Sequence, residues 1–252
     1  MIIVKAGGSA ITDKTQDFTP RLPVMEGVAA QLSRITATEQ IILVHGGGSY
    51  GHPLAKEFEL NKGFHDKSQL EGISQTRYSM TELNQLFLSC LIRNRVPAVA
   101  VQPSACFVCT SKRISLSFLE PIKNILELQC LPVLYGDVVS DSKMGVCILS
   151  GDQIVSYLAH ALSVEKVIFG LEVDGLYTKD PQYEDAELVK DITFSDLNSI
   201  TGGETGDVTK GMKGKLSEIS KMEGIEVNLI NLTKEGTLLK AVQGNVEGTW
   251  IR

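Results

Sequence analysis

Apolar residues along this chain gather in short runs that alternate with longer segments of helical period. The short runs, rich in Ile, Val and Leu, lie at 2–5, 40–44, 98–101, 131–134, 166–169 and 226–230. Apolar residues recur every three or four positions over 22–35, 69–92, 118–128, 152–162 and 212–222. Apolar strands alternating with helices are typical of βαβ units, in which helices cover both faces of a mainly parallel sheet. The pattern therefore predicts an α/β fold.

The chain gives no sign of being divided. No repeat, charge block or Pro/Gly-rich linker interrupts its 252 residues, so we expect a single domain over 1–252. The longest stretch without helical period, roughly 171–210, is rich in Gly, Asp and Thr, and we expect hairpins and functional loops there. The sequence contains no run of 18 apolar residues, so no membrane span is predicted. Its N-terminal residues predict a strand and lack the pattern of a signal peptide.

Charge and cysteine content narrow the classes of partner. A net charge of -6 argues against general binding of nucleic acid, so any anionic ligand must meet locally placed lysines and backbone amides. Cys106 and Cys109 form a C-x-x-C motif in a run that predicts a strand. The motif does not indicate a zinc site, because the sequence has no second such pair and no histidine nearby. We expect reduced, structural cysteines and a cytoplasmic protein.

Two of the predicted strands end in glycine-rich turns. The first is followed by Lys5-Ala6-Gly7-Gly8-Ser9 and the second by residues 45–49, His-Gly-Gly-Gly-Ser. Ligands of open α/β sheets bind beyond the carboxyl ends of the strands, and glycine lets backbone amides and a helix N-terminus approach an anion. Neither turn matches a standard nucleotide motif, and each alone could be a plain tight turn. Side by side, they indicate a polyphosphate or two phosphates brought together.

Lysines accompany these turns. Lys5 ends a strand that should be buried, Lys14 lies in a turn, and Lys213 and Lys215 open a helix. Phosphoryl transfer needs alignment of donor and acceptor, and cations where charge spreads over the moving group. Asp152, at the start of a helix, is a candidate for holding the lysines, or else a plain N-terminal helix acid.

As a set, these residues resemble the amino acid kinase superfamily over essentially the whole chain. The matching motifs are Lys5-Ala-Gly-Gly-Ser, the His-Gly-Gly-Gly turn, Asp174-Gly-Leu-Tyr-Thr-Lys-Asp180-Pro181 and Asp207-Val-Thr-Lys-Gly-Met-Lys-Gly-Lys215. The resemblance implies a three-layer αβα sandwich with an open, mainly parallel eight-stranded sheet. It also implies an acceptor-binding lobe at about 1–160 and a lobe at about 161–252 that binds ATP with magnesium.

Within the superfamily, the segment after the second glycine turn resembles isopentenyl phosphate kinases and the related fosfomycin kinases. Ser49-Tyr50-Gly51-His52 carries this resemblance, together with the spacing from Gly-Gly-Ser to Lys14 and with Ile148-Leu-Ser-Gly-Asp152. It implies ATP-dependent phosphorylation of isopentenyl phosphate, in isoprenoid synthesis by a mevalonate route, by a homodimer. The acceptor is a phosphate monoester, so no strong general base is required. His52 can donate a hydrogen bond to it and, when protonated, a charge.

The resemblance also assigns roles to individual residues. Lys5, Lys14, His52 and Asp152 are expected to be catalytic, with Lys14 stabilising the transition state. The expected ATP-binding residues are Lys5, Gly7, Gly8, Ser9, Gly48, Asp174, Tyr177, Thr178, Asp180, Pro181, Gly211 and Lys215. The expected acceptor-binding residues are Ala6, Gly46, Gly47, His52 and Gly151. We expect His45 to be structural, and Lys210, at a position that is often glycine, to be a solvated loop residue.

Magnesium is expected to arrive on the ATP phosphates, without an all-protein metal site. Three alternatives stay open. A phosphonate kinase of the fosfomycin type would need a more polar acceptor pocket. An amino-acid acceptor would call for carboxylate- and ammonium-binding groups, which are not evident near the second glycine turn. A non-catalytic nucleotide sensor would lose phosphate-contacting lysines, and these are present.

Overall fold

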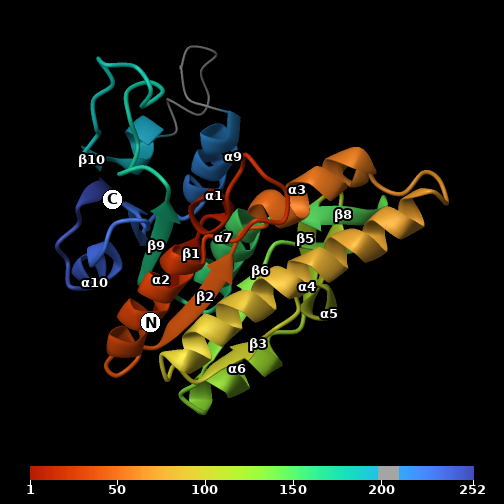
Figure 1. Cartoon of the computed structure of the whole chain (residues 1–252), viewed down its shortest axis with the longest axis horizontal. Coiled ribbons are helices and arrows are strands. Elements are labelled where there is room, and N and C mark those ends of the chain that lie inside the picture. Colours follow the sequence, from red (N-terminus) through yellow and green to blue (C-terminus); the bar gives the residue numbers. More distant parts are fainter. Residues whose placement is uncertain (198–209) are drawn as a thin grey trace.

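Eight strands form the central sheet of the computed structural model, which describes residues 1–197 and 210–252 (Figure 1). Their order is β10-β12-β11-β9-β1-β2-β6-β3, and all neighbours pair in parallel except β11 and β12. The expected open, mainly parallel sheet is therefore confirmed. The strands are β1 (Ile2–Ala6), β2 (Ile41–His45), β3 (Ala98–Ala100), β6 (Leu131–Tyr135), β9 (Lys166–Leu171), β10 (Asp191–Ile192), β11 (Glu226–Asn231) and β12 (Gly248–Ile251).

Helices cover both faces of this sheet because successive strand residues point to opposite sides. Ile3 belongs to one apolar cluster and its neighbours Ile2 and Val4 to the other. The first face is covered by α6 (Glu120–Glu127), α7 (Gly151–Ala161) and α9 (Lys210–Ile219). The second is covered by α1 (Gly8–Ile11), α2 (Leu22–Ile35), α3 (Gly48–Glu57), α4 (Gln69–Arg93) and α10 (Thr237–Val242). The short 3-10 helix η1 (Leu60–Lys62) follows α3.

A second, four-stranded sheet lies between 107 and 149. Its order is β5-β4-β7-β8, with β4 (Phe107–Thr110) and β5 (Arg113–Ser117) forming one hairpin and β7 (Asp137–Asp141) and β8 (Gly145–Leu149) another. Ser111 and Lys112 take the left-handed conformation in the first turn. The Asp141 carboxylate accepts hydrogen bonds from their backbone N–H groups, and from those of Lys143 and Met144. One carboxylate thus holds both turns.

Several sequence expectations need correction here. The main hairpins lie at 107–149. Between β9 and α9, the described residues form β10, a helical turn at 194–197 and an isolated antiparallel bridge between Tyr177 and Leu188. Cys106 ends the short helix α5 (Pro103–Cys106), so the strand begins at Phe107. The helix expected from 212 begins at Lys210, which is therefore a helix residue. All five cysteines are unpaired, as expected.

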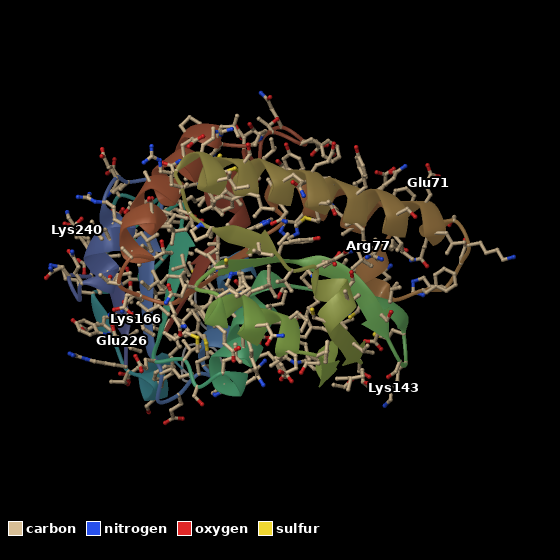
Figure 2. All side chains as sticks on the ribbon, turned by 90° about the horizontal axis from the view of Figure 1, so that it is seen from below. Glu71, Arg77, Lys143, Lys166, Glu226 and Lys240 are labelled. Carbon is tan, nitrogen blue, oxygen red and sulfur yellow. The ribbon has the colours of Figure 1, made fainter. Side chains whose placement is uncertain are left out.

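The strand order separates the chain into two parts along the sheet. Strands from residues 2–135 form one side and strands from 166–251 the other, with β1 and β9 adjacent at the boundary. Lys166 and Glu226, labelled in Figure 2, pair at 3.0 Å where β9 and β11 begin, at the edge opposite the glycine turns. Among the described helices, none is long and apolar enough to cross a bilayer.

Candidate active site

The carboxylate of Asp152 lies between two buried lysine side chains. Lys5 Nζ is 2.9 Å from Asp152 Oδ1, and Lys215 Nζ is 3.0 Å from Oδ2. Lys5 lies near the carboxyl end of β1 on the same face as Ile3, toward α7 and α9, which supply Asp152 and Lys215. The two lysines are only 5% and 9% exposed. The fold therefore brings together three residues that the sequence predicted for one site.

The charges of this Lys5–Asp152–Lys215 cluster do not balance. Burial opposes ionisation of Asp152, but Lys5 and Lys215 outweigh it and hold the pKa of the carboxyl well below its usual range. Burial, and then the charge of Lys5, lower the pKa of Lys215 to about 8, although Asp152 opposes this. A single carboxylate thus serves two buried ammonium groups. A bound anion would neutralise the remaining positive charge.

A capping box fixes the first turn of α7, where Gly151 and Asp152 lie. Ser150 Oγ accepts from the Gln153 backbone N–H at 3.2 Å, and Gln153 Oε1 accepts from the Ser150 N–H at 3.1 Å. A Cβ on Gly151 would lie 3.1 Å from the His45 carbonyl oxygen and 3.5 Å from Lys5 Cε. The start of α7 therefore packs directly on the ends of β1 and β2.

The two glycine turns pack backbone against backbone. A Cβ on Gly8 would lie 2.4 Å from Gly48 N, and a Cβ on Gly46 would lie 2.7 Å from Gly8 N. Thr12 Oγ1 donates to the Gly8 carbonyl at 2.8 Å and accepts from the Ser49 N–H at 3.0 Å. Only glycine permits this approach, and Thr12, which the sequence analysis did not single out, ties the turns together.

The remaining residues of the turns support this arrangement. Ala6 ends β1 and is fully buried, and the Gly7 N–H donates to the Gly170 carbonyl at 2.8 Å. Ser9 lies in α1, and Gly47 precedes α3, where a Cβ would come within 3.1 Å of Met80 Sδ. These residues line the edge of the sheet next to the lysine cluster.

His52 lies on α3 near this cluster and is exposed. Desolvation, and then the charges of Lys5 and Lys14, lower the pKa of His52 below its ordinary value, while Asp152 opposes the shift. Lys14 is exposed and forms an ion pair with Glu172, the residue after β9. These shifts favour the neutral imidazole of His52, and the charge expected of it depends on a bound anion.

His45 has a different environment. It is fully buried, with Nε2 3.2 Å from Asn84 Oδ1 and Nδ1 3.1 Å from the Gly46 carbonyl oxygen. Its ring stacks on Tyr135 with centroids 5.5 Å apart. Burial lowers the pKa of His45 to about 4. The residue supports the second glycine turn from below, as expected for a structural histidine.

Comparison with known proteins identifies the family of this chain. The family model described as "Amino acid kinase family" matches residues 1–229. The chain belongs to the amino acid kinase family. A relative within this family, the isopentenyl phosphate kinase of Methanothermobacter thermautotrophicus, is 35% identical over 100% of this chain and 98% of its own length.

Solved structures agree with this family assignment. One described as "X-ray structures of isopentenyl phosphate kinase" has a TM-score of 0.86 and 33% identity, and covers 100% of both chains. The T. acidophilum isopentenyl phosphate kinase in a product complex has a TM-score of 0.85 and 30% identity, again over 100% of both chains. The amino acid kinase fold implied by the sequence motifs is confirmed.

A second polar group in this amino acid kinase surrounds Asp174. Its Oδ1 accepts from Asn231 Nδ2 at 2.9 Å and pairs with Lys234 Nζ at 2.6 Å, and the Tyr177 hydroxyl lies 3.5 Å from Oδ2. Asp174, Lys234 and Trp250 also line a hollow of about 510 Å³. Asn231 and Lys234 were not among the residues predicted for the site. A polar residue at the end of the 226–230 apolar run was the available signal for Asn231.

The rest of the expected nucleotide residues stand apart from the lysines. Thr178 Oγ1 accepts from the Glu187 N–H at 3.1 Å, Asp180 Oδ1 accepts from the Gln182 N–H at 3.0 Å, and Pro181 is exposed. Within the described residues, no hydrogen bond or ion pair joins these three to the Lys5–Asp152–Lys215 cluster. Gly211 lies in the first turn of α9, and residues 207–209 of the same motif lie outside the described residues.

Proposed function

We propose that this amino acid kinase transfers the γ-phosphoryl group of ATP to isopentenyl phosphate, giving isopentenyl diphosphate and ADP. The observation that carries the proposal is the Lys5–Asp152–Lys215 cluster, a buried excess of positive charge beside two abutting glycine turns. Such a site suits two phosphate groups held close together. The full-length similarity to proteins named isopentenyl phosphate kinase supports the choice of acceptor.

The proposed chemistry is a direct in-line displacement. An oxygen of the acceptor's phosphate attacks the γ-phosphorus of ATP, a new P–O bond forms, and the bond to the β,γ-bridging oxygen breaks as ADP leaves. Lys5 and Lys215 stabilise the charge on the phosphates from a buried position, where electrostatic attraction is strong. Lys14, exposed and paired with Glu172, exchanges that partner for the transferring group. No general base is needed, because the acceptor oxygen is already ionised.

His52 has a separate role toward the acceptor. Desolvation, and then the charges of Lys5 and Lys14, lower its pKa and so favour a neutral imidazole that can donate one hydrogen bond. A bound dianion offsets those two positive charges and so raises the pKa of His52 toward its ordinary value. We propose that His52 and the amides of Gly46 and Gly47 hold the acceptor's phosphate, with Gly151 beside it.

The residues present fit magnesium brought in by ATP. The acidic side chains nearest the lysines, Asp152 and Glu172, already pair with lysines. Within the described part of the chain, no group of three or more His, Cys, Asp or Glu residues could hold a metal. Magnesium carried by ATP would neutralise part of the phosphate charge there. The hollow lined by Asp174, Lys234 and Gly248 supports placing the nucleoside part of ATP beside Asp174.

We further propose an acceptor lobe at about 1–160, an ATP lobe at about 161–252, a homodimer and a cytoplasmic location. The division of the central sheet between the two parts of the chain supports the lobes. Edge strand β3 carries Val99, 40% exposed, close along the chain to Ile92, 62% exposed, which supports a second copy covering this edge. Five unpaired cysteines support a reducing compartment.

The test is ADP release with Mg-ATP and five acceptors: isopentenyl phosphate, dimethylallyl phosphate, fosfomycin, acetylglutamate and UMP. Each is measured with wild type, His52→Ala and the control variant His65→Ala, an exposed histidine in the loop before α4. We expect isopentenyl phosphate to be the best acceptor. We expect its turnover to fall about 100-fold in His52→Ala and to stay unchanged in His65→Ala.

Other outcomes would redirect the proposal. Preference for fosfomycin would keep the mechanism and replace the acceptor. Turnover of acetylglutamate or UMP would overturn the assignment of His52 to a phosphate monoester of small apolar alcohols. ATP binding without turnover of any acceptor would indicate a nucleotide sensor and not an enzyme.

A further inference from the structure

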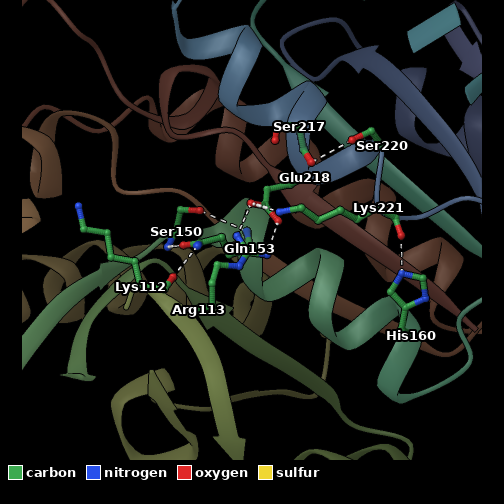
Figure 3. Close-up of polar contacts among 9 residues, drawn as sticks. All are labelled: Lys112, Arg113, Ser150, Gln153, His160, Ser217, Glu218, Ser220 and Lys221. Carbon is green, nitrogen blue, oxygen red and sulfur yellow. Dashed lines mark hydrogen bonds and ion pairs between the residues drawn. The ribbon is translucent and has the colours of Figure 1, made fainter. Parts of the chain in front are cut away.

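Arg113 and Glu218 form a two-point ion pair close to Gln153 and Lys221 (Figure 3). Arg113 Nη1 donates to Glu218 Oε1 at 2.6 Å, and Nη2 donates to Oε2 at 3.1 Å. The two residues are 105 positions apart and join β5 of the small sheet to helix α9. Glu218 is only 7% exposed, so removing Arg113 would leave a buried carboxylate with a weaker partner set.

Helix α9 connects this ion pair to the candidate active site. Lys215 and Glu218 are three residues apart on α9 and so lie on neighbouring positions of one helix face. Lys215 reaches Asp152 at the start of α7, while Glu218 reaches Arg113. Two ion pairs therefore hold α9, Lys215–Asp152 within the cluster and Glu218–Arg113 outside it. Together they fix where Lys215 lies along and around the helix axis.

Arg113 is itself held in place by the start of α7. Gln153, next to Asp152, forms the capping box with Ser150 and donates from Nε2 to the Lys112 carbonyl at 2.9 Å. The neighbouring Lys112 N–H donates to Asp141 Oδ2 at 2.7 Å. The turn that carries Arg113 is thus fixed to the same helical turn that carries Asp152.

The far end of α9 has weaker ties. Lys221 Nζ donates to Glu218 Oε1 at 2.9 Å, and His160 Nε2 lies 2.7 Å from the Lys221 carbonyl oxygen. A hollow of about 440 Å³ lies between β5, α7 and the end of α9, lined by Arg113, Tyr157, His160 and Lys221. Polar contacts beside this hollow therefore join β5 to α9, in addition to the apolar core that Ile114 of β5 shares with Leu216 and Ile219 of α9.

We propose that Arg113 is a positioning residue for ATP: by holding Glu218 it fixes α9 and keeps the Lys215 ammonium group against Asp152. Arg113 touches neither phosphate in this arrangement and acts only through α9. The expected kinetic effect of Arg113 rests on the proposed phosphoryl transfer. Its expected effect on the position of Lys215 does not. Two readouts therefore separate the two proposals.

The first readout is kinetic. Arg113→Gln should lower kcat/KM for ATP about tenfold and leave KM for isopentenyl phosphate within about twofold, because the acceptor contacts lie on α3 and the glycine turns. The charge-swapped double variant Arg113→Glu with Glu218→Arg should recover most of the loss. Arg93→Gln is the control, since Arg93 forms an ion pair with Glu26 between α4 and α2, on the other face of the central sheet.

The second readout needs no turnover. The rate at which an acylating reagent labels Lys215 is measured by mass spectrometry at a series of pH values. The midpoint of this dependence reports the pKa of the Lys215 amine, which burial, Lys5 and Asp152 set. In wild type, half-maximal labelling is expected near pH 8. In Arg113→Gln, a freed α9 exposes Lys215 and moves that midpoint upward by about one pH unit.

The outcomes are distinct. An unchanged labelling midpoint in Arg113→Gln would overturn the positioning role, whether or not the enzyme turns over. An equal loss in both substrates' kinetics, or a loss that Arg93→Gln reproduces, would show general destabilisation and also overturn it. A shifted midpoint in a protein that phosphorylates none of the acceptors would support the positioning of Lys215 while the proposed function fails.

Discussion

His45 and His52 are seven residues apart, and burial gives them different chemistry. His45 lies under the second glycine turn, where the loss of water favours its neutral form, and its hydrogen bonds to Asn84 and Gly46 oppose this only in part. His52 faces solvent from α3, and its charge responds to the lysines around it. The sequence shows two histidines flanking one glycine run. Only the packing of β2 against α4 assigns one to structure and one to the site.

The first residue-scale prediction concerns His45 and stability. Its pKa in the folded protein, about 4, lies below the ordinary 6.5, so between these values the unfolded chain binds a proton that the folded protein does not. The free energy of unfolding should therefore fall as pH drops from 6.5 to 4, by about 3 kcal/mol from this group. Urea unfolding of wild type and His45→Asn checks this, because the difference between them should shrink toward pH 4.

The control for that experiment is the exposed His65. His65→Asn should follow the wild-type pH dependence throughout. If His45→Asn follows it as well, the acid loss of stability belongs to other groups.

The second residue-scale prediction concerns Lys215 and ATP. Its pKa of about 8 means that the ammonium form is present below that pH and is lost above it. Since kcat/KM reports the free enzyme, kcat/KM for ATP should decline as pH rises above about 8. In Lys215→Arg the guanidinium stays charged, so the decline should move to higher pH even where the maximal rate is reduced. An unmoved alkaline limb would assign it to a different group.

At the scale of elements, the two glycine turns act as one structure. Gly8 and Gly48 meet through backbone atoms, and Thr12 bonds to both turns. Two α-helices begin at these turns, so the amide groups at both helix starts face the same edge of the sheet. Each turn alone carried little information in the sequence, and their contact gives them their common role.

This contact predicts different effects for two glycine substitutions. Gly48 has φ +49°, and a Cβ there would lie 2.0 Å from Thr12 Oγ1, so Gly48→Ala should destabilise the protein by about 1–3 kcal/mol and reduce ATP turnover. Gly27→Ala on α2 meets nothing within 4 Å and should stabilise the protein by about 0.5–1 kcal/mol. Urea midpoints of the two variants should move in opposite directions. An unchanged urea midpoint in Gly48→Ala would mean that the two glycine turns can move apart with little loss of free energy of unfolding.

Sequence pattern predicted the central elements but, of the small sheet, only the strand β4, for a physical reason. The strand runs at 2–5 and 166–169 and the helix at 22–35 are buried on one or both sides, so their hydrophobic period reports their structure. Strand β5 has only half-buried and exposed residues, and its turn is held by Asp141 from a distant hairpin. Such a strand carries no strong period of its own.

The site divides in the same way. Lys5, Asp152 and Lys215 were predictable because a charged residue beside buried strands and helix starts must face a polar site. Arg113, Glu218 and Lys234 were not, because each looks like a solvated surface charge until its partner is brought close by the fold. Pairing between distant residues is set by tertiary structure and leaves no local signal.

At the scale of the whole molecule, the charge of the candidate active site is opposite in sign to the net charge of the chain. The chain carries a net charge of -6, yet its candidate active site has two buried lysines for one carboxylate. Mg-ATP, which is less negative than free ATP, is the form expected to approach such a protein most readily.

This leads to a prediction on metal removal. Mg-ATP at 100 times its Kd should raise the free energy of unfolding by about 2.7 kcal/mol, seen as a higher Tm. EDTA should abolish turnover and reduce that increase. Without ATP, neither magnesium nor EDTA should move Tm, because the metal is expected to bind through the phosphates. A shift of Tm by magnesium alone would reveal a metal site of the protein itself.

The central place of β1 also has a consequence for the order of events during synthesis. Residues 2–6 leave the ribosome before either partner of β1, which pairs on one side with β2 at 41–45 and on the other with β9 at 166–171. Until β9 emerges, one edge of β1 stays unpaired, and Lys215 comes later still. The nascent chain must therefore keep an apolar strand from pairing wrongly while most of the protein is translated. The site that starts at the fifth residue is among the last parts of the molecule to form.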